Sequence, residues 1–138
     1  MKYLLDTNTC IFLMKNNREV VVQYRKNQEA GIAISVITAG ELYYGVYNSA
    51  YPDKNGLALA NFLIGVDTLD FDNAAAMEYG RIRAILRQQG TPIGTMDMLI
   101  AAQAKSAGLT LVTNNTREFE RVNGLALVDW LGQTTAPC

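Results

Sequence analysis

Short apolar runs alternate with amphipathic stretches along the chain, and this alternation predicts strands separated by helices. The runs that predict strands are residues 3–5, 32–34, 66–71, 109–112 and 125–128. The run 66–71 alternates only in part between apolar and polar residues, which favours a place at an edge of the sheet. Because strands that alternate with helices build parallel sheets covered on both faces, we expect an α/β fold: a three-layer α/β/α sandwich around a mostly parallel sheet.

Apolar residues at helical spacing predict the intervening helices. These cover residues 10–14, 19–28, 36–47, a stripe from 57 to 64, a longer helix that precedes a loop at 90–94, the segment 97–107, and a short segment near 116. The predicted capping residues are 7–9, Ser35, Asp72 or Asn73, and Thr116. Gly31 and Gly108 end two helices, and residues 51–53 and 55–56 predict turns. The helix 97–107 is rich in alanine and nearly uncharged, so we expect it to be buried.

Composition describes an ordinary globular chain. Of 138 residues, 49% are hydrophobic and 18% charged, which predicts one domain over residues 1–132 followed by a tail at 133–138. The net charge of −1 means that any nucleic-acid binding must use a local basic patch. No apolar run approaches the roughly 20 residues of a membrane span, and the start becomes polar too early for a signal peptide. We therefore expect a cytosolic (cytoplasmic) protein that does not contact a membrane.

The chain contains no histidine, which excludes Ser-His-Asp triads, histidine general bases and histidine-ligated zinc. Its two cysteines, Cys10 and Cys138, are far apart in the sequence and cannot form a zinc cluster. A chain of this size needs no disulfide, so both are expected to be free thiols in a reducing compartment. Cys10 is expected to be a small core residue.

Acidic side chains follow the predicted strands. Asp6 comes directly after the first strand, Glu41 lies on the helix after the second, and Asp97 opens the alanine-rich helix. The polar group 113–115, followed by Glu118, comes after the fourth strand. Because ligand sites in parallel sheets form beyond the carboxyl ends of the strands, these side chains are expected to point into one cleft.

Clustered carboxylates repel one another and stay ionised together only when a cation joins them. Oxygen ligands favour Mg²⁺ or Mn²⁺ over zinc. With no histidine and no plausible cysteine nucleophile, the pattern indicates metal-assisted hydrolysis of a phosphodiester.

Each acidic residue also has a purely structural interpretation. Asp6 is a suitable helix cap, which contributes about 1 kcal/mol. Glu41 has apolar neighbours in sequence and is either directed to solvent or partnered. Asp97 in a first helical turn is favoured by the helix dipole. Glu118 belongs to a charged segment in which pairing with Arg117 or Arg121 at the surface is an alternative.

Basic and aromatic residues are less informative. Three arginines share one helix and a fourth lies near Glu118: Arg81, Arg83, Arg87 and Arg117. They form either a solvated face or a groove for the phosphate backbone of RNA. Four tyrosines, Tyr43, Tyr44, Tyr47 and Tyr51, either stack on unpaired bases or pack in the core or at a subunit interface.

Four stretches resemble, in order, the four sequence motifs of PIN domains. They are Leu4–Asn8, Ile34–Thr38 with Glu41–Gly45, Thr91–Ala102, and Leu111–Phe119. The complete set at these spacings is similar to bacterial VapC-type toxins of type II toxin–antitoxin systems, and the likeness covers about residues 2–131. The order of the four motifs is more specific than any one of them.

The resemblance implies an α/β/α sandwich with Mg²⁺- or Mn²⁺-dependent endoribonuclease activity. It also implies a homodimer and inhibition by a VapB-type antitoxin, and it allows a larger toxin–antitoxin assembly. Asp6, Glu41 and Asp97 match the acidic positions of the family. Asn115 stands where many PIN domains have an acid, and Glu118, one helical turn later, is expected to supply it. Relatives that share the 113–119 stretch suggest a structured RNA such as initiator tRNA.

We therefore expect Asp6 and Asp97 to hold the metal, with Glu41 as a further ligand or as the group that positions the attacking water. Asn115 and Glu118 complete the site, and the supporting hydrogen bonds come from Thr7, Asn8 and Thr113. Two alternatives stay open. One is a non-catalytic RNA-binding or scaffold protein with the same fold. The other is a phospho-acceptor domain that uses Asp6. It is less favoured because this chain lacks the second acid that such domains carry near the strand-end aspartate.

Overall fold

The computed structural model describes residues 1–132 and contains a five-stranded sheet in which all neighbouring strands are parallel. The strands are β1 (Tyr3–Leu5), β2 (Ile32–Ser35), β3 (Asp67–Leu69), β4 (Thr110–Val112) and β5 (Leu127–Val128). Their order in the sheet is β3-β2-β1-β4-β5. The predicted parallel sheet is confirmed, with β3 at one edge as expected. The predicted tail at 133–138, with Cys138, lies outside the described residues.

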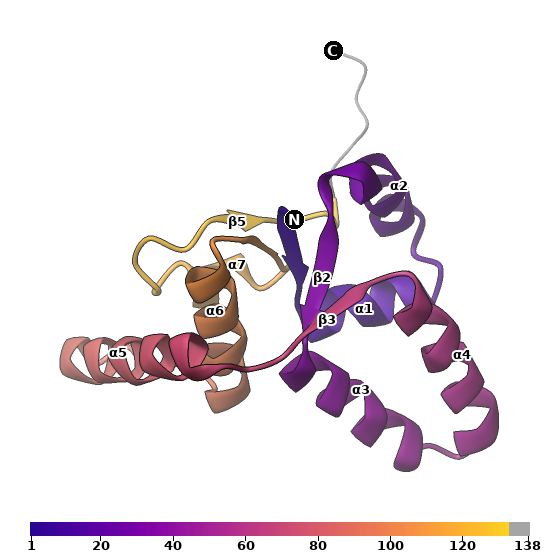
Figure 1. Cartoon of the computed structure of the whole chain (residues 1–138), viewed down its shortest axis with the longest axis horizontal. Coiled ribbons are helices and arrows are strands. Elements are labelled where there is room, and N and C mark those ends of the chain that lie inside the picture. Colours follow the sequence, from indigo (N-terminus) through magenta and orange to yellow (C-terminus); the bar gives the residue numbers. More distant parts are fainter. Residues whose placement is uncertain (133–138) are drawn as a thin grey trace.

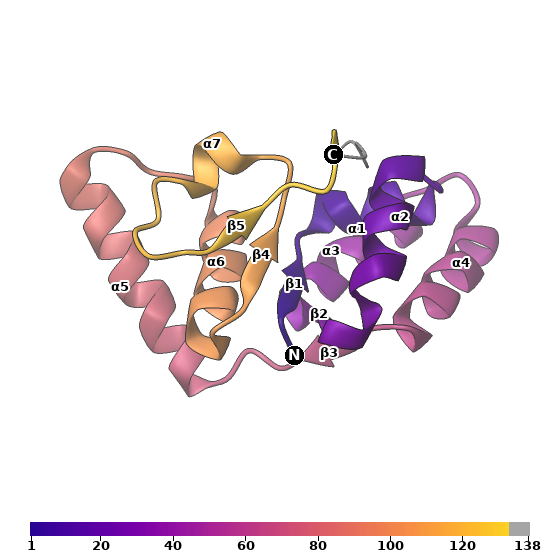
Figure 2. The same ribbon diagram turned by 90° about the horizontal axis from the view of Figure 1, so that it is seen from above.

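Helices cover both faces of this sheet (Figures 1 and 2). They are α1 (Thr7–Met14), α2 (Arg18–Asn27), the 3₁₀ helix η1 (Gln28–Ala30), α3 (Val36–Tyr47), α4 (Pro52–Ile64), α5 (Asn73–Gln89), α6 (Thr95–Ala107) and α7 (Thr116–Phe119). In Figure 2, α1–α4 lie on one side of the strands and α5–α7 on the other, which confirms the three-layer sandwich. Within residues 1–132, no helix combines the length and apolar character needed to cross a membrane.

The central strand contributes to a hydrophobic core on each side of the sheet. Leu4 packs into the cluster formed with α5 and α6, whereas Leu5 packs into the cluster formed with α1–α4. Both side chains are fully buried, and complete burial of a leucine contributes roughly 2 kcal/mol. Cys10 is also fully buried, so its expected place in the core is confirmed. Burial on both faces explains why the first strand is an unbroken apolar run.

The strand order creates a topological switch point beside β1. The chain adds β2 and β3 on one side of β1, and then crosses over to place β4 on the other side. The backbone N–H of Asp6 donates to the carbonyl oxygen of Val112 at 3.0 Å, so the ends of β1 and β4 stay together. In open parallel sheets the crevice that holds a ligand lies at the carboxyl ends of the strands flanking such a point. Asp6, which directly follows β1, therefore lies at this crevice.

Several helix starts differ from the sequence prediction, and three of the differences concern the acidic edge of the sheet. Asp6, not residues 7–9, is the N-cap of α1, and the helix begins at once with Thr7. The helix α6 begins at Thr95, two residues earlier than predicted. Asn115, not Thr116, occupies the N-cap position of α7, without a capping hydrogen bond from its side chain. The predicted caps Ser35 and Asp72 are confirmed.

The turns predicted at residues 51–56 are wrong, because α4 begins at Pro52 and runs through Gly56. Proline suits the first helical turn, where its missing N–H leaves no hydrogen bond unmade. A glycine inside a helix costs about 1 kcal/mol relative to alanine. Burial of Leu59, which is 1% exposed, in the cluster shared with α3 outweighs this cost.

The predicted packing of the four tyrosines in the core is wrong. Tyr43, Tyr44 and Tyr47 lie on the outer face of α3 and Tyr51 precedes α4, and their exposed fractions range from 45% to 78%. The buried face of α3 carries Leu42 and smaller residues instead. Base stacking or a subunit contact therefore stays a prediction for these side chains.

We predict that Gly56→Ala stabilises the protein by about 0.5–1 kcal/mol, because alanine loses less conformational entropy than glycine on entering a helix. The added Cβ would meet only Val46 Cγ1, at an ordinary contact distance of 3.6 Å. Urea denaturation measures the change. Gly108→Ala is the control with the opposite sign, since Gly108 has a φ of 68°. A loss of stability in Gly56→Ala would contradict the placement of Gly56 inside α4 and would favour the turn predicted from the sequence.

Candidate active site

Asp6 combines a structural and an electrostatic role at the end of β1. Its Oδ1 accepts a hydrogen bond of 2.8 Å from the backbone N–H of Thr9, which confirms that it caps α1. The side chain is nevertheless only 4% exposed. Burial raises the pKa of Asp6, hydrogen bonds with Thr113 and Thr9 oppose this, and the charge of Glu41 adds to it. A cap at the surface would not be buried beside a second carboxylate.

Glu41 lies in the second turn of α3 and is half-buried. The hydroxyl of Thr7, the first residue of α1, donates a hydrogen bond to Glu41 Oε1. This bond joins two helices that begin at neighbouring strand ends. Glu41 is therefore held toward Asp6 rather than free in solvent.

Asp97 and Glu118 form a coupled pair of carboxyl groups, from the first turn of α6 and from α7. Burial, followed by the charge of Glu118 and a hydrogen bond with it, raises the pKa of Asp97 from 3.8 to about 7; Asp6 and Glu41 add to the rise. The pKa of Glu118 is lowered, first by the backbone N–H of Gly94. These opposite shifts favour the protonated form of Asp97 beside the ionised form of Glu118.

The carboxylate of Glu118 is also held by neutral donors. Gly94 N–H donates to Oε1 at 2.9 Å, and Asn115 Nδ2 donates to Oε2. Within residues 1–132, ion pairs closer than 4 Å involve Glu78 only, so the predicted alternative of surface pairing with Arg117 or Arg121 is not what holds Glu118.

Thr113 and Asn115 continue the site from the end of β4. Thr113 is fully buried and hydrogen-bonds with Asp6. Its Oγ1 also accepts a hydrogen bond of 3.0 Å from the backbone N–H of Asn115, which directs the chain towards α7. The two residues thus connect the Asp6 side of the crevice with the Glu118 side.

Four carboxyl groups that are remote in sequence therefore meet at the carboxyl edge of the sheet, close enough for their charges to raise the pKa of Asp6 and of Asp97. In the described part of the chain, no three cysteine or acidic side chains form a ready-made set of metal ligands. The donor atoms that the site does offer are carboxylate, amide and hydroxyl oxygens, which are the ligands of hard divalent cations rather than of a structural zinc site.

Two residues predicted at the site lie at its margin. Asn8 is exposed, and within residues 1–132 it makes no hydrogen bond with the acidic groups. Arg117 is exposed on α7, next to Glu118 in sequence. Neither contributes to holding the carboxylates.

The other predicted arginines lie along α5, outside the acidic cluster. Arg81 donates two hydrogen bonds to Glu78, at 2.8 and 2.7 Å, and Arg83 donates to the hydroxyl of Tyr79 at 2.7 Å. Arg83 and Arg87 line a shallow hollow on the outer side of this helix. The C-terminal end of α5 leads into the 90–94 loop that precedes Asp97.

Sequence reasoning missed two backbone donors of the site, Thr9 and Gly94. Thr9 stands three residues after the cap Asp6, the position whose N–H a capping side chain usually binds. Gly94 is the residue before α6, where backbone N–H groups have no partner within the helix. Both were open to prediction once the helix starts were placed correctly.

A parallel α/β sandwich with carboxyl groups at the carboxyl edge of its sheet is the arrangement expected of a PIN domain, and comparison with known proteins agrees. The family model of the PIN domain matches residues 3–125. The chain is 46% identical over 130 residues to tRNA(fMet)-specific endonuclease VapC of Shigella flexneri, covering 94% of this chain and 98% of that protein. It is 45% identical over 132 residues to Ribonuclease VapC2 of Haemophilus influenzae strain Rd, covering 95% and 99%.

Known structures give the same result. The crystal structure of DNA-bound VapBC from Salmonella typhimurium superposes with a TM-score of 0.90 at 44% identity, covering 94% of this chain and 98% of that chain. The chain therefore belongs to the PIN-domain family, and within that family to the VapC group.

We predict that Asp97→Asn raises the melting temperature of the metal-free protein at pH 8. With its pKa raised from 3.8 to about 7, folded Asp97 binds a proton that the unfolded chain releases. The stability this provides is present below about pH 4 and is lost as the pH rises through about 7. Asparagine cannot ionise, so the variant avoids the loss.

Differential scanning calorimetry should show a rise of a few degrees at pH 8, since about 1 kcal/mol corresponds to roughly 3–4 °C in a chain of this length. The difference should shrink at pH 5. Asp67→Asn, at an exposed position on β3, is the control and should not move the transition. A fall for Asp97→Asn at pH 8 would contradict the coupling.

Proposed function

We propose that this protein is a divalent-metal-dependent endoribonuclease toxin, neutralised by a VapB-type antitoxin. The observation that carries the proposal is the meeting of Asp6, Glu41, Asp97 and Glu118 at the switch point, where burial and the neighbouring charges raise the pKa of Asp6 and of Asp97. Folding places these charges together at a cost in stability. That cost is expected where the cluster serves to bind a cation.

Asp6 and Asp97 are the proposed metal-holding residues, and the ion is Mg²⁺ or Mn²⁺. When bound, such an ion supplies positive charge that polarises a phosphoryl oxygen and acidifies a water. The proton on Asp97 must leave before Asp97 can act as a ligand. Ion binding should therefore weaken as the pH falls below about 7.

Glu41 and Glu118 are the remaining acidic groups of the proposed site. Thr7 holds Glu41 in place, so its carboxylate can orient the attacking water or ligate the ion. Glu118 is fixed by Gly94 and Asn115 and completes the negative pocket. Because the chain has no histidine, a carboxylate of this site is the proposed acceptor of the proton of the water.

RNA is the proposed substrate, and the names of the relatives in Shigella flexneri and Salmonella typhimurium make tRNA the first one to test. Arg83, Arg87 and Arg117 are the proposed contacts to its phosphate backbone. Arg81 is the weakest candidate, because Glu78 already neutralises it. The proposed assembly is a homodimer that joins the antitoxin in a larger complex in the cytosol.

We predict that Asp97→Asn and Asp6→Asn each lower RNA cleavage by at least about a hundredfold, because each removes a carboxylate that holds the ion. The assay is cleavage of purified tRNA in Mg²⁺, with EDTA abolishing it and excess Mn²⁺ restoring it. Asp67→Asn serves as the control that keeps full activity.

Cleavage that persists in EDTA or in both variants would contradict the metal-dependent proposal. Binding of tRNA without cleavage by the unsubstituted protein would favour the non-catalytic alternative. An acyl-phosphate trapped at Asp6 would favour the phospho-acceptor alternative.

We predict that Thr7→Val lowers the cleavage rate about 10- to 100-fold, because it removes the hydroxyl that orients Glu41. Valine matches threonine in shape, so α1 should keep its length and the protein its melting temperature within a few degrees. Thr68→Val on the exposed edge strand is the matched control. Undiminished cleavage by Thr7→Val would mean that Glu41 needs no orienting partner.

A further inference from the structure

The loop at 90–94 enters α6 and is tied to the segment around α7 by two hydrogen bonds. Arg121 Nη1 donates to the carbonyl oxygen of Pro92 at 3.0 Å, and the N–H of Gly94 donates to Glu118 Oε1 at 2.9 Å. Ile93, between them, is buried in the core with Phe119. This loop therefore sets where the first turn of α6, with Asp97, stands relative to Glu118.

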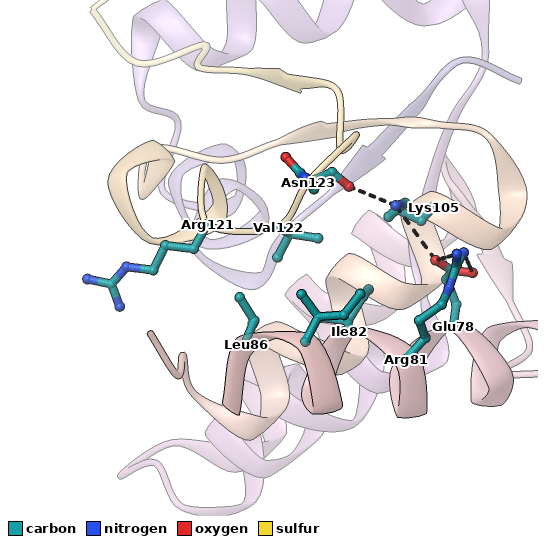
Figure 3. Close-up of a pocket in the computed structure, with 9 residues that line it drawn as sticks. Glu78, Arg81, Ile82, Leu86, Lys105, Arg121, Val122 and Asn123 are labelled. Atoms are coloured by element: carbon teal, nitrogen blue, oxygen red, sulfur yellow. Dashed lines mark hydrogen bonds and ion pairs between the residues drawn. The ribbon is translucent and has the colours of Figure 1, made fainter. Parts of the chain in front are cut away.

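The segment that carries Arg121 is itself firmly held (Figure 3). Val122 is buried, and Lys105 near the end of α6 donates to the carbonyl oxygen of Asn123 at 2.7 Å. Lys105 also lies 3.7 Å from Glu78, which anchors it to α5. Figure 3 shows the Arg121 side chain directed away from this Lys105–Glu78 pair. The segment around Arg121 thus contacts α6 near the C-terminal end of that helix. It also contacts the 90–94 loop, which precedes the N-terminal end of the same helix.

The two bonds to the loop are not equivalent. Glu118 belongs to the carboxylate cluster, and both its oxygens already accept hydrogen bonds, from Gly94 and Asn115. If it were the only link, any shift of Glu118 toward a cation would release the loop and move Asp97. The charge of Arg121 also lowers the pKa of Glu118, but its hydrogen bond to the carbonyl oxygen of Pro92 uses no carboxylate oxygen and so holds the loop independently of Glu118. A guanidinium suits this purpose because its planar donors are rigid and always charged.

We propose that Arg121 is a positioning residue of the active site, which fixes the 90–94 loop so that Asp97 and Glu118 stay in register when a cation binds. The inference rests on the proposed function for its effect on catalysis. Its effect on the loop does not depend on that function.

Arg121→Met tests the proposal, with Arg25→Met on α2 as the matched control for the loss of one exposed arginine. Amide hydrogen exchange in the metal-free protein should become about tenfold faster at Gly94 while staying unchanged at Leu111 in β4. Mn²⁺ titration should show weaker binding by a similar factor. The turnover number for RNA should fall about 10- to 100-fold with little change in KM, because the reacting groups lose their alignment.

Arg121→Lys keeps the charge and one donor, and should restore part of the Gly94 protection and of the Mn²⁺ affinity. It also replaces Arg121→Met in all measurements if that variant does not fold. Unchanged exchange at Gly94, or faster exchange at Gly94 and Leu111 alike, would overturn the proposal. If the unsubstituted protein cleaves no RNA, the proposed function fails, whereas the exchange measurement still decides the role of Arg121.

Discussion

Burial of carboxyl groups beside one another at the switch point of a parallel sheet is the constraint on which the rest of this structure depends. Asp6 and Asp97 each have a raised pKa, chiefly because burial disfavours their charged forms. The fold answers this cost by favouring the protonated form of Asp97 beside the ionised Glu118, and with neutral donors to the oxygens of Glu118. Such a site is least stable where it is most ionised, and this is the state in which a divalent cation binds best.

The donors that hold the carboxylates come from the ends of secondary-structure elements. Thr9 and Gly94 contribute backbone N–H groups at the starts of α1 and α6, where helices leave such groups unpaired. Thr7 contributes a hydroxyl from the first residue of α1. The helices α1 and α3 start at this edge because β1 and β2 end there, whereas α6 reaches it through the loop after α5. The topology that makes the crevice therefore also supplies its hydrogen bonds.

The two sides of the crevice are built differently. Asp6 and Glu41 sit where strands pass directly into helices, and Thr7 links their helices at once. The positions of Asp97 and Glu118 depend instead on the 90–94 loop and on the four-residue helix α7. Both elements are too short to form a core of their own. The segment around Arg121 compensates by joining both to the body of the domain. Because the chain belongs to the VapC group, we interpret this arrangement as a nuclease site.

The sequence by itself determined the parallel sheet, the edge position of β3, the caps Ser35 and Asp72, and which acidic residues follow strands. These features are local, since apolar periodicity and capping chemistry act over a few residues. Only the tertiary structure decided that Gly56 lies inside a helix, because burial of Leu59 against α3 outweighs the local preference for a turn. It alone also decided between the two expectations for Glu118, a place beside Asp97 and pairing with a surface arginine, and it brought Arg121 to Pro92. Those contacts join residues 21 and 29 positions apart, and their formation depends on how separate helices pack, which no local pattern encodes.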